Sequence, residues 1–142
     1  MAKQILVNVS WSGKNFSASL DENIPGAIVV TNKNYNALID DLEDTLDFHI
    51  EGMVEDGEKV ADWLLKKEYT FKYKLTTAAL LQLYSNFTSY KAIAKESGIN
   101  EQLISHYAND LKKPRPKQKE KIIEGLQRIG RKLMGVREVE IA

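Results

Sequence analysis

Polar side chains at helical spacing mark residues 100–109 as a surface that could bind DNA. Leu103, Ile104 and Tyr107 recur on one side of a helix, as residues that face a core do. The other side holds side chains that can hydrogen-bond to base edges or phosphates: Glu101, Gln102, Ser105, His106 and Asn109. Gln102 is suited to adenine, while Asn100 is a good N-cap whose helix would direct its amides at a phosphate.

A second helix is expected directly before this one, over residues 89–97. Ala94 is small enough for another helix to cross closely, and Gly98 would end the helix in a left-handed conformation at little cost. Ile99 follows as an apolar plug. Two short helices joined by a glycine-containing turn are typical of the DNA-binding helix-turn-helix. A generic helical hairpin is the alternative interpretation.

A basic segment follows the second helix and favours the DNA-binding interpretation. It contains six cationic side chains interrupted by two prolines: Lys112, Lys113, Arg115, Lys117, Lys119 and Lys121, with Pro114 and Pro116. We expect Lys112, Lys113 and Arg115 to bind phosphates that flank the groove. A solvated charge run is the alternative, but it does not explain the position of the segment.

The composition is that of a globular protein. The chain has 142 residues, of which 43% are hydrophobic and 28% charged. No apolar run approaches the roughly 20 residues of a membrane span, and the amino terminus alternates like a strand rather than a signal peptide. The chain has no cysteine, which excludes disulfides and thiolate metal sites. We therefore expect a cytoplasmic protein without a membrane partner.

A charge asymmetry lies behind the net charge of zero. Residues 1–66 contain five lysines and twelve acidic residues, and residues 67–142 contain fifteen basic and eight acidic residues. The basic part suits nucleic acid, whereas the acidic part would be repelled by it and should face a different partner, such as a basic protein.

The amino-terminal third predicts a sheet covered by one helix. Alternating residues predict strands over 5–11 and 16–20 that form a hairpin, a short third strand over 27–30 and a fourth over 69–75. Asn34 should cap a long helix with one apolar stripe. Residues 58–68 are expected to form a partly ordered loop.

From residue 76 onward the pattern is helical. Helices are predicted over 76–84, 89–97, 100–109 and about 117–134, which gives domains at 1–75 and 76–136 and a tail at 137–142. Gly125 and Gly130 each cost the last helix about 1 kcal/mol relative to alanine. Close packing against a neighbour, including a second subunit, would be a reason to keep them.

No catalytic, metal or cofactor site is predicted. His49 lies at the margin of the long helix's apolar stripe and is expected to be packed there. Four carboxylates of that helix could share a cation but are more typical of a solvated face: Asp40, Asp41, Asp44 and Asp47. The predicted strands 5–9, 16–20 and 27–30 contain no carboxylate for a two-metal nuclease, and the chain has no phosphate-binding glycine loop or nucleophile elbow.

The whole chain resembles the HicB family of antitoxins. The amino-terminal part is similar in its two strands around a Ser-Gly turn, in ENIPGAIVVTNKNYNALIDDLEDTLDFHIEG and in the late strand EYTFKYKLT. The carboxy-terminal part, SGINEQLISHYANDLKKPRPKQKEKIIEGLQRIGRKL, resembles the helix-turn-helix of one branch of the family. The resemblance extends from about Ile5 to Leu133. The asparagines at 34 and 36 depart from the threonine or acidic residues that are frequent there.

This resemblance implies an α+β protein with two functions. It implies an inactive, partial RNase H-like amino-terminal domain of order β-β-β-α-β that binds a HicA-like, mRNA-cleaving toxin and covers its active site. For that contact we name the acidic helix face, with Asp40, Asp44 and Asp47, and the strand loops. It also implies that the helix-turn-helix represses the protein's own operon. Such domains bind palindromic operator DNA as dimers with half-sites about 34–36 Å apart, so a homodimer or higher homo-oligomer is expected.

Three other hypotheses remain open at this point. The chain could be a stand-alone repressor whose amino-terminal domain senses a small ligand, although no pocket motif supports that. It could be a nuclease, against which the carboxylate-free strands argue. It could also be an adaptor whose basic segment touches RNA.

Overall fold

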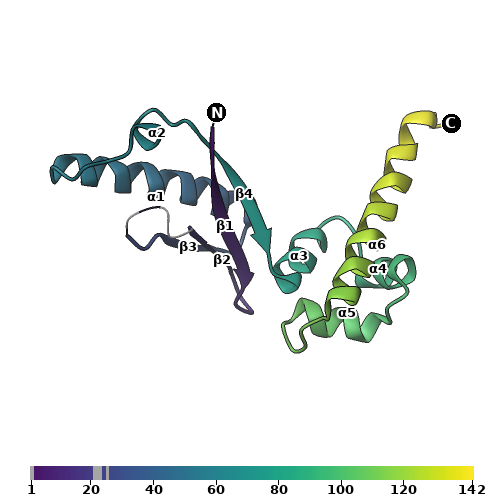
Figure 1. Ribbon diagram of the computed structural model, residues 1–142. Helices are drawn as coiled ribbons and strands as arrows, with labels where there is room; N and C mark the ends of the chain where they lie inside the picture. The colour runs from purple at the N-terminus through teal and green to yellow at the C-terminus, as the bar shows by residue number, and fades with distance from the viewer. Residues whose placement is uncertain (1, 21–23, 25) are drawn as a thin grey trace. The chain divides into compact units, whose positions relative to one another are not determined.

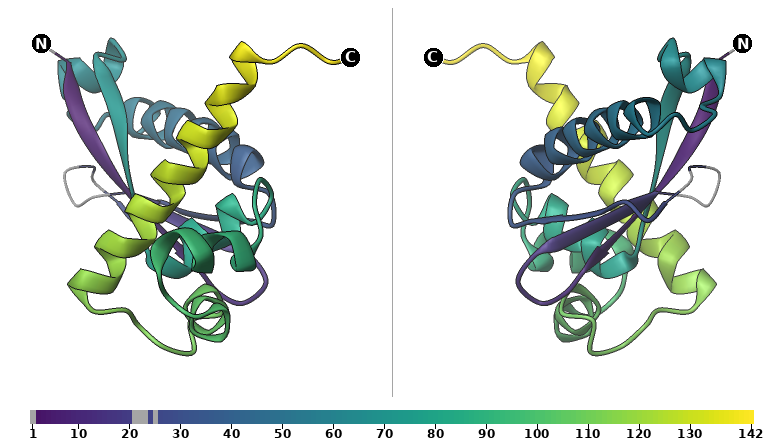
Figure 2. Two further views of the ribbon diagram at one scale, coloured as in Figure 1. Left: turned by 90° about the vertical axis from the view of Figure 1, so that its right-hand side faces the viewer. Right: turned by 90° about the vertical axis from the view of Figure 1, so that its left-hand side faces the viewer.

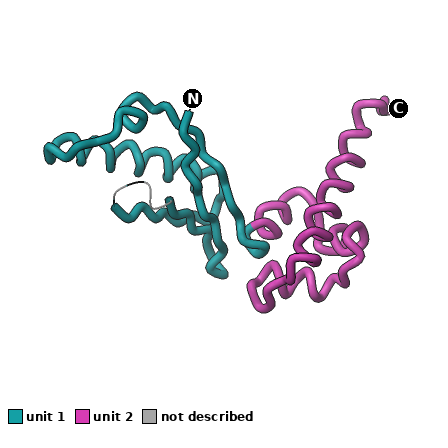
Figure 3. Tube along the Cα trace, viewed as in Figure 1, with its two compact units in different colours: residues 1–79 teal, residues 80–142 magenta. Residues whose placement is uncertain are grey.

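The structure divides the chain into two compact units. The computed structural model describes residues 2–20, 24 and 26–142, which form a mixed α+β protein. Unit 1 comprises residues 1–79 and unit 2 residues 80–142 (Figure 3). The division falls inside helix α3 (Thr77–Tyr84), a few residues after the domain boundary predicted at residue 76. The predicted boundary between two functional domains stays a prediction.

Unit 1 contains a four-stranded mixed sheet. Strands β1 (Lys3–Trp11) and β2 (Phe16–Leu20) form the predicted antiparallel hairpin, in which Val9 pairs with Ala18. Strand β3 (Val29–Asn32) is antiparallel to β2, and β4 (Tyr69–Leu75) is parallel to β1. The resulting order is β3-β2-β1-β4 (Figure 1). The parallel step requires a crossover connection, and a long helix provides it.

Helix α1 (Tyr35–Glu55) lies along one face of this sheet (Figures 1 and 2). Its first turn begins where predicted, because the Asn34 side chain accepts a hydrogen bond from the Ala37 amide at 2.9 Å. The apolar stripe of α1 is buried together with the inward residues of β1 and β2: Leu38, Leu42, Leu46, Ile50, Met53, Ile5, Val7, Val9, Phe16 and Ala18. Burial of each large aliphatic side chain contributes about 1.5–3 kcal/mol, so this contact is the core of unit 1.

Two sequence predictions in unit 1 were wrong in detail. The third strand was predicted at 27–30 but is Val29–Asn32, because its register with β2 pairs Thr31 with Ser17 and Asn32 with Phe16. At this sheet edge two polar residues extend the strand, which an apolar pattern does not reveal. The predicted loop at 58–68 contains a short helix, α2 (Asp62–Leu65), in which the buried Leu64 makes the folded conformation favourable. The predicted β-β-β-α-β order therefore gains one helix.

Unit 2 is helical. After α3 come α4 (Tyr90–Ser97), α5 (Glu101–Ala108), α6 (Pro116–Met134) and a 3-10 turn, η1 (Gly135–Glu138), in the tail that the sequence pattern did not place. One apolar cluster joins α3, α4, α5 and α6: Leu81, Ile93, Ile99, Ile104, Tyr107, Ala108 and Ile122. Across the described part of the chain, no helix has the length and apolar character needed to cross a membrane.

Candidate nucleic-acid interface

Helices α4 and α5 are joined by a short turn whose conformation depends on three adjacent residues. Gly98 adopts φ 75° and its amide donates to the Ala94 carbonyl, which ends α4 in the left-handed conformation that glycine tolerates. Ser97 is buried, and its hydroxyl accepts a hydrogen bond from the Ile99 amide at 3.3 Å. Ile99 is itself buried in the core of unit 2. The turn is therefore held by a backbone conformation, a hydrogen bond and an apolar contact.

Helix α5 begins at Glu101 and is capped by Asn100, whose side-chain oxygen accepts a hydrogen bond from the Leu103 amide at 2.8 Å. Ile104 and Tyr107 are buried on its inner side, as predicted, while Leu103 is half-buried against the same cluster. At the other end, the Asn109 side chain donates to the Ser105 carbonyl at 2.8 Å, so this amide caps the helix. Both ends of α5 are thus capped by asparagine side chains.

The predicted DNA-contacting residues of α5 do not all have the same exposure. Glu101 and Gln102 are exposed in its first turn, next to the exposed Asn100. Ser105 and His106, one turn later, are half-buried. The amino-terminal turn is therefore the part of α5 that is most open to a groove.

A basic pocket lies after α5. Asp110 adopts φ 57°, and the Leu111 amide donates to the His106 carbonyl at 2.9 Å, so the chain leaves α5 through a left-handed residue. The segment beyond forms a pocket of about 420 Å³. Among the described residues, five cationic side chains, one aromatic and one amide line it: Lys112, Lys113, Arg115, Lys117, Lys121, Tyr107 and Gln118.

The pocket contains the three residues that were predicted to bind phosphates, together with residues that the sequence analysis did not select. Lys112, Lys113 and Arg115 all line it. Lys117 and Lys121 were counted in the basic segment but not selected as site residues. The sequence feature that could have identified them is their i, i+4 spacing in the first turns of α6, because this spacing places both side chains on one face of the helix.

The amino terminus of α6 adds to the positive potential of the pocket. Pro116 occupies the first turn, where its missing amide proton costs no hydrogen bond, and Arg115 precedes it without a side-chain cap. The first amides of a 19-residue helix have a partial positive charge, which favours an anion. None of the seven residues that line the pocket is acidic, so no carboxylate of its lining offsets this potential.

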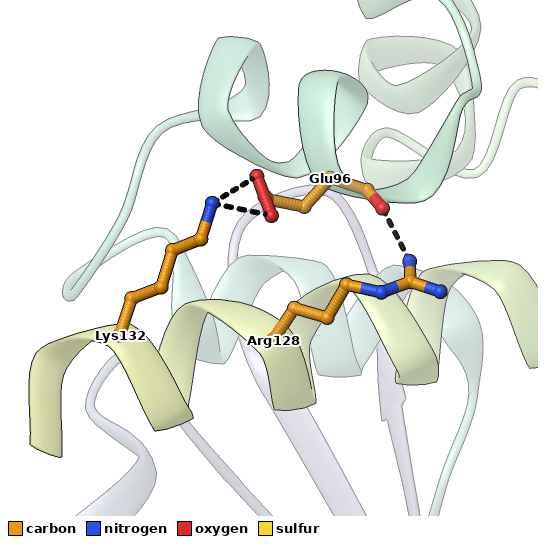
Figure 4. Close-up of polar contacts among 3 residues, drawn as sticks. All are labelled: Glu96, Arg128 and Lys132. Atoms are coloured by element: carbon orange, nitrogen blue, oxygen red, sulfur yellow. Dashed lines mark hydrogen bonds and ion pairs between the residues drawn. The ribbon is translucent and has the colours of Figure 1, made fainter.

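Helix α6 is held against α4 by a group of polar contacts around Glu96 (Figure 4). The Lys132 ammonium donates to both carboxylate oxygens at 2.8 and 2.9 Å, and Arg128 donates to the Glu96 backbone carbonyl at 2.6 Å. The hydrogen bond from Lys132 lowers the pKa of the Glu96 carboxyl, and the charges of Lys132, Lys95 and Arg128 act in the same direction. Partial burial opposes them. These contacts keep the pocket-forming helix in place relative to α4 and α5.

In unit 1, the structure separates the three aspartates that were predicted to contact a protein partner. Asp40 and Asp44 are exposed on the outer side of α1. Asp47 is half-buried and lies 3.5 Å from the Lys67 ammonium. Burial raises the pKa of Tyr69, with Asp47 and then Glu43 raising it further, so these carboxylates lie on the side of α1 near β4. Asp47 is therefore engaged within unit 1, whereas Asp40 and Asp44 remain open.

The remaining acidic and histidine candidates have structural roles. Asp41 accepts a hydrogen bond from the Asn32 side chain at 2.9 Å, which joins α1 to β3. The His49 ring lies directly over Gly26, where an added Cβ would be 2.7 Å from its Cε1 atom. In the described part of the chain, no three histidine or acidic side chains are grouped so that they could hold a metal ion.

The chain matches no protein-family model, no curated protein and no solved structure. A function must therefore be inferred from the geometry and electrostatics of these two surfaces, together with the sequence resemblance.

Proposed function

We propose that this protein is a DNA-binding repressor that uses α4 and α5 as a helix-turn-helix. The observation that supports this best is the combination of a polar, capped amino-terminal turn on α5 with the five-cation pocket that follows it. Side chains such as Gln102 would contact base edges in the major groove, and the pocket would bind the flanking phosphates. This division between base contacts and phosphate contacts is what sequence-specific binding requires.

The charges of the two units support the same assignment. Unit 2 contains twelve basic and seven acidic residues, whereas unit 1 contains eight basic and thirteen acidic residues. DNA would therefore attract unit 2 and repel unit 1. If each of the five cations in the pocket meets one phosphate, the logarithm of the affinity should fall with the logarithm of salt concentration with a slope of about −4 to −5.

Titration of a labelled DNA duplex from the region upstream of the protein's own gene tests the proposal. Fluorescence anisotropy should show tighter binding than to a scrambled duplex by at least about 1,000-fold at moderate salt. A Lys112→Gln/Lys113→Gln variant should bind more weakly to both duplexes and show a flatter salt slope. A matched Lys72→Gln/Lys74→Gln variant, with its changes on β4 of unit 1, should retain binding. Equal affinity for the upstream and scrambled duplexes would exclude a sequence-specific repressor.

We further propose that unit 1 is the antitoxin part, which binds a small basic HicA-like toxin and is not itself an enzyme. Two observations support this proposal besides the resemblance to HicB-family antitoxins. Strands β1 to β4 contain no Asp or Glu, so the sheet offers no carboxylate pair for a metal-dependent nuclease. Asp40 and Asp44 form an open acidic face on α1, and their charges complement those of an RNA-binding protein.

Co-expression of the tagged full chain with the small open reading frames next to its gene tests the second role. A basic protein that is toxic when expressed alone should co-purify. Asp40→Lys/Asp44→Lys should reduce its recovery, whereas Asp56→Lys/Glu58→Lys, a matched charge change beyond α1, should not. If no neighbour binds while the upstream DNA still does, the antitoxin role is excluded and a ligand-sensing repressor becomes the hypothesis to test by ligand-dependent melting.

A further inference from the structure

Strand β4 forms an open edge of the sheet in unit 1. It is the last strand in the order β3-β2-β1-β4, so only one of its two sides is paired (Figure 1). At its two ends, the Lys3 amide donates to the Glu68 carbonyl at 3.0 Å, and the Thr76 amide donates to the Val9 carbonyl at 2.9 Å. Because backbone groups alternate in direction along a strand, every even-numbered residue of β4 points its amide and carbonyl at β1.

The odd-numbered residues Tyr69, Phe71 and Tyr73 direct their backbone groups the other way, towards the free edge. Within the described part of the chain, no hydrogen bond joins these groups to another element. An unpaired row of amides and carbonyls is a template on which a further strand can form.

The same three residues place their rings in a row on the side of the sheet that α1 covers. In the register of β1 with β4, Phe71 pairs with Ile5 and Tyr73 with Val7, and both of these β1 residues are buried under α1. The ring centroids of Tyr69 and Phe71 are 5.5 Å apart, and those of Phe71 and Tyr73 are 6.2 Å apart. Tyr73 remains 37% exposed. We define the β4 edge as the outward backbone groups and the rings of these three residues.

An unpaired carboxylate lies beside the rings. Burial raises the pKa of Tyr73, and the charge of Glu43 on α1 raises it further. Glu43 is exposed and has no ion-pair partner among the described residues. Burial and then Asp47 raise the pKa of Tyr69 in the same way, but the Lys67 ammonium lies 3.5 Å from Asp47 and balances its charge. The ring side of the β4 edge therefore has a free negative charge at Glu43.

The opposite face of the β4 edge is positive. Lys72 and Lys74 alternate with the rings and are exposed, so they lie on the face that α1 does not cover. A second copy of β4, paired along its full length, would set Lys72 against its counterpart, which is unfavourable. A nucleic-acid strand stacked on the rings would be repelled by Glu43. These charges favour an extended peptide as the occupant.

We propose that the β4 edge binds an extended segment of a partner protein as a fifth strand of the sheet. On the ring side the segment would have basic or apolar side chains, which can lie over the aromatic faces and meet Glu43. On the other side it would have acidic or neutral side chains, which suit Lys72 and Lys74. Backbone pairing would supply affinity, and the alternation of side chains would supply specificity. The proposal rests on the antitoxin role of unit 1, because it gives the basic partner of that unit a mode of binding.

A capped, fluorescein-labelled peptide tests the β4 edge in the full chain. The sequence Thr-Arg-Glu-Val-Glu-Arg-Thr has the required alternation and the seven-residue length of β4. It reads the same in both directions, so it fits a parallel or an antiparallel strand. Fluorescence anisotropy should show saturable binding. Thr-Arg-Arg-Val-Glu-Glu-Thr, which has the same composition without the alternation, should bind at least about 10-fold more weakly.

The variant Tyr73→Pro separates backbone pairing from side-chain contact. Proline removes one outward amide and leaves the hydrogen bonds to β1 in place, so the sheet should be retained, as circular dichroism can verify. Peptide binding should fall further than in Tyr73→Ala, which loses the ring but keeps the amide. Glu43→Gln should also weaken binding. Its matched control is Glu55→Gln, about 18 Å further along α1, which should not.

Amide hydrogen exchange of the unmodified chain gives a second readout. With the alternating peptide bound, the amides of Tyr69, Phe71 and Tyr73 should exchange more slowly. The amides of Lys72 and Lys74 already donate to β1, so their exchange should change little. A peptide that only touched the rings would not produce this alternating pattern.

Absence of binding by the alternating peptide, equal binding of both peptides, or unchanged exchange at the three outward amides would overturn the proposal. If a toxic neighbour co-purifies equally well with Tyr73→Pro and with the parent, the antitoxin role stands and the β4 edge is excluded as its site. If the peptide binds the β4 edge while no neighbour co-purifies, the edge stands and the antitoxin role fails. The two failures are therefore distinguishable.

Discussion

Gly125 of α6 packs directly on Ser97 of α4. A Cβ built on Gly125 would lie 3.0 Å from both the Cβ and the backbone nitrogen of Ser97, and 3.1 Å from its Cα. Ser97 cannot move easily, because it is buried and its hydroxyl accepts the Ile99 amide of the α4–α5 turn. This close approach of α6 therefore falls on the residue that helps to set the turn before α5.

Gly125→Ala should destabilise unit 2 although alanine favours a helix by about 1 kcal/mol. Steric overlap of this kind costs about 1–3 kcal/mol, and the backbone atoms of Ser97 can relax little. Denaturant unfolding of the full chain measures the change. Gly52→Ala in α1 is the matched control, because a Cβ there would meet no atom of the described residues within 4 Å, and it should be neutral or stabilising. A stabilised Gly125→Ala variant would contradict the described packing.

Asn100→Ala should lower the stability of unit 2 by about 0.5–2 kcal/mol, because the Leu103 amide loses its acceptor. Asn100→Ser should retain most of the stability, since serine caps helices nearly as well. Chemical denaturation of the three proteins, followed by circular dichroism, measures both effects. Equal losses in the alanine and serine variants would show that the asparagine acts through something other than the cap.

Gln102→Ala should relax DNA specificity at one base pair, at a cost of about 1–3 kcal/mol for the specific duplex only. Lys113→Ala should weaken binding to all sequences and reduce the salt slope by about 1. Anisotropy titrations on specific and scrambled duplexes at several salt concentrations separate the two outcomes. Equal losses on both duplexes for both variants would refute the assignment of Gln102 to base contacts.

The Glu96–Lys132 contact should stabilise the protein at neutral pH and lose that effect in acid. Because the hydrogen bond from Lys132 lowers the pKa of Glu96 below its ordinary value of 4.5, the folded state binds the proton less readily than the unfolded state. The stabilisation is thus fully present above pH 4.5 and is lost as the pH falls through the lowered pKa. Glu96→Gln should be less stable than the parent at pH 7, and the difference should shrink towards pH 3. A difference independent of pH would mean that the charge of Glu96 contributes nothing.

Features that depend on neighbouring residues could be predicted from the amino-acid sequence. The alternation in Lys3–Trp11 and Tyr69–Leu75, the stripe of Tyr35–Glu55 and the caps at Asn34 and Asn100 predicted these elements closely. A cap or an apolar period acts within a few residues of the chain, so local pattern is sufficient to find it.

Features that depend on residues far apart in the chain could not be predicted from local pattern and became visible in the folded structure. The strand Val29–Asn32 is defined by its register with β2, and the helix Asp62–Leu65 by the burial of Leu64. The same holds for side chains of one type. Asp47 has a cationic neighbour, Lys67, whereas Asp40 is exposed. Gly125 packs against Ser97, whereas Gly130 has no described atom so close to it. Packing between distant segments sets these environments. Residue type and local spacing are therefore not sufficient to tell one aspartate or one glycine from another.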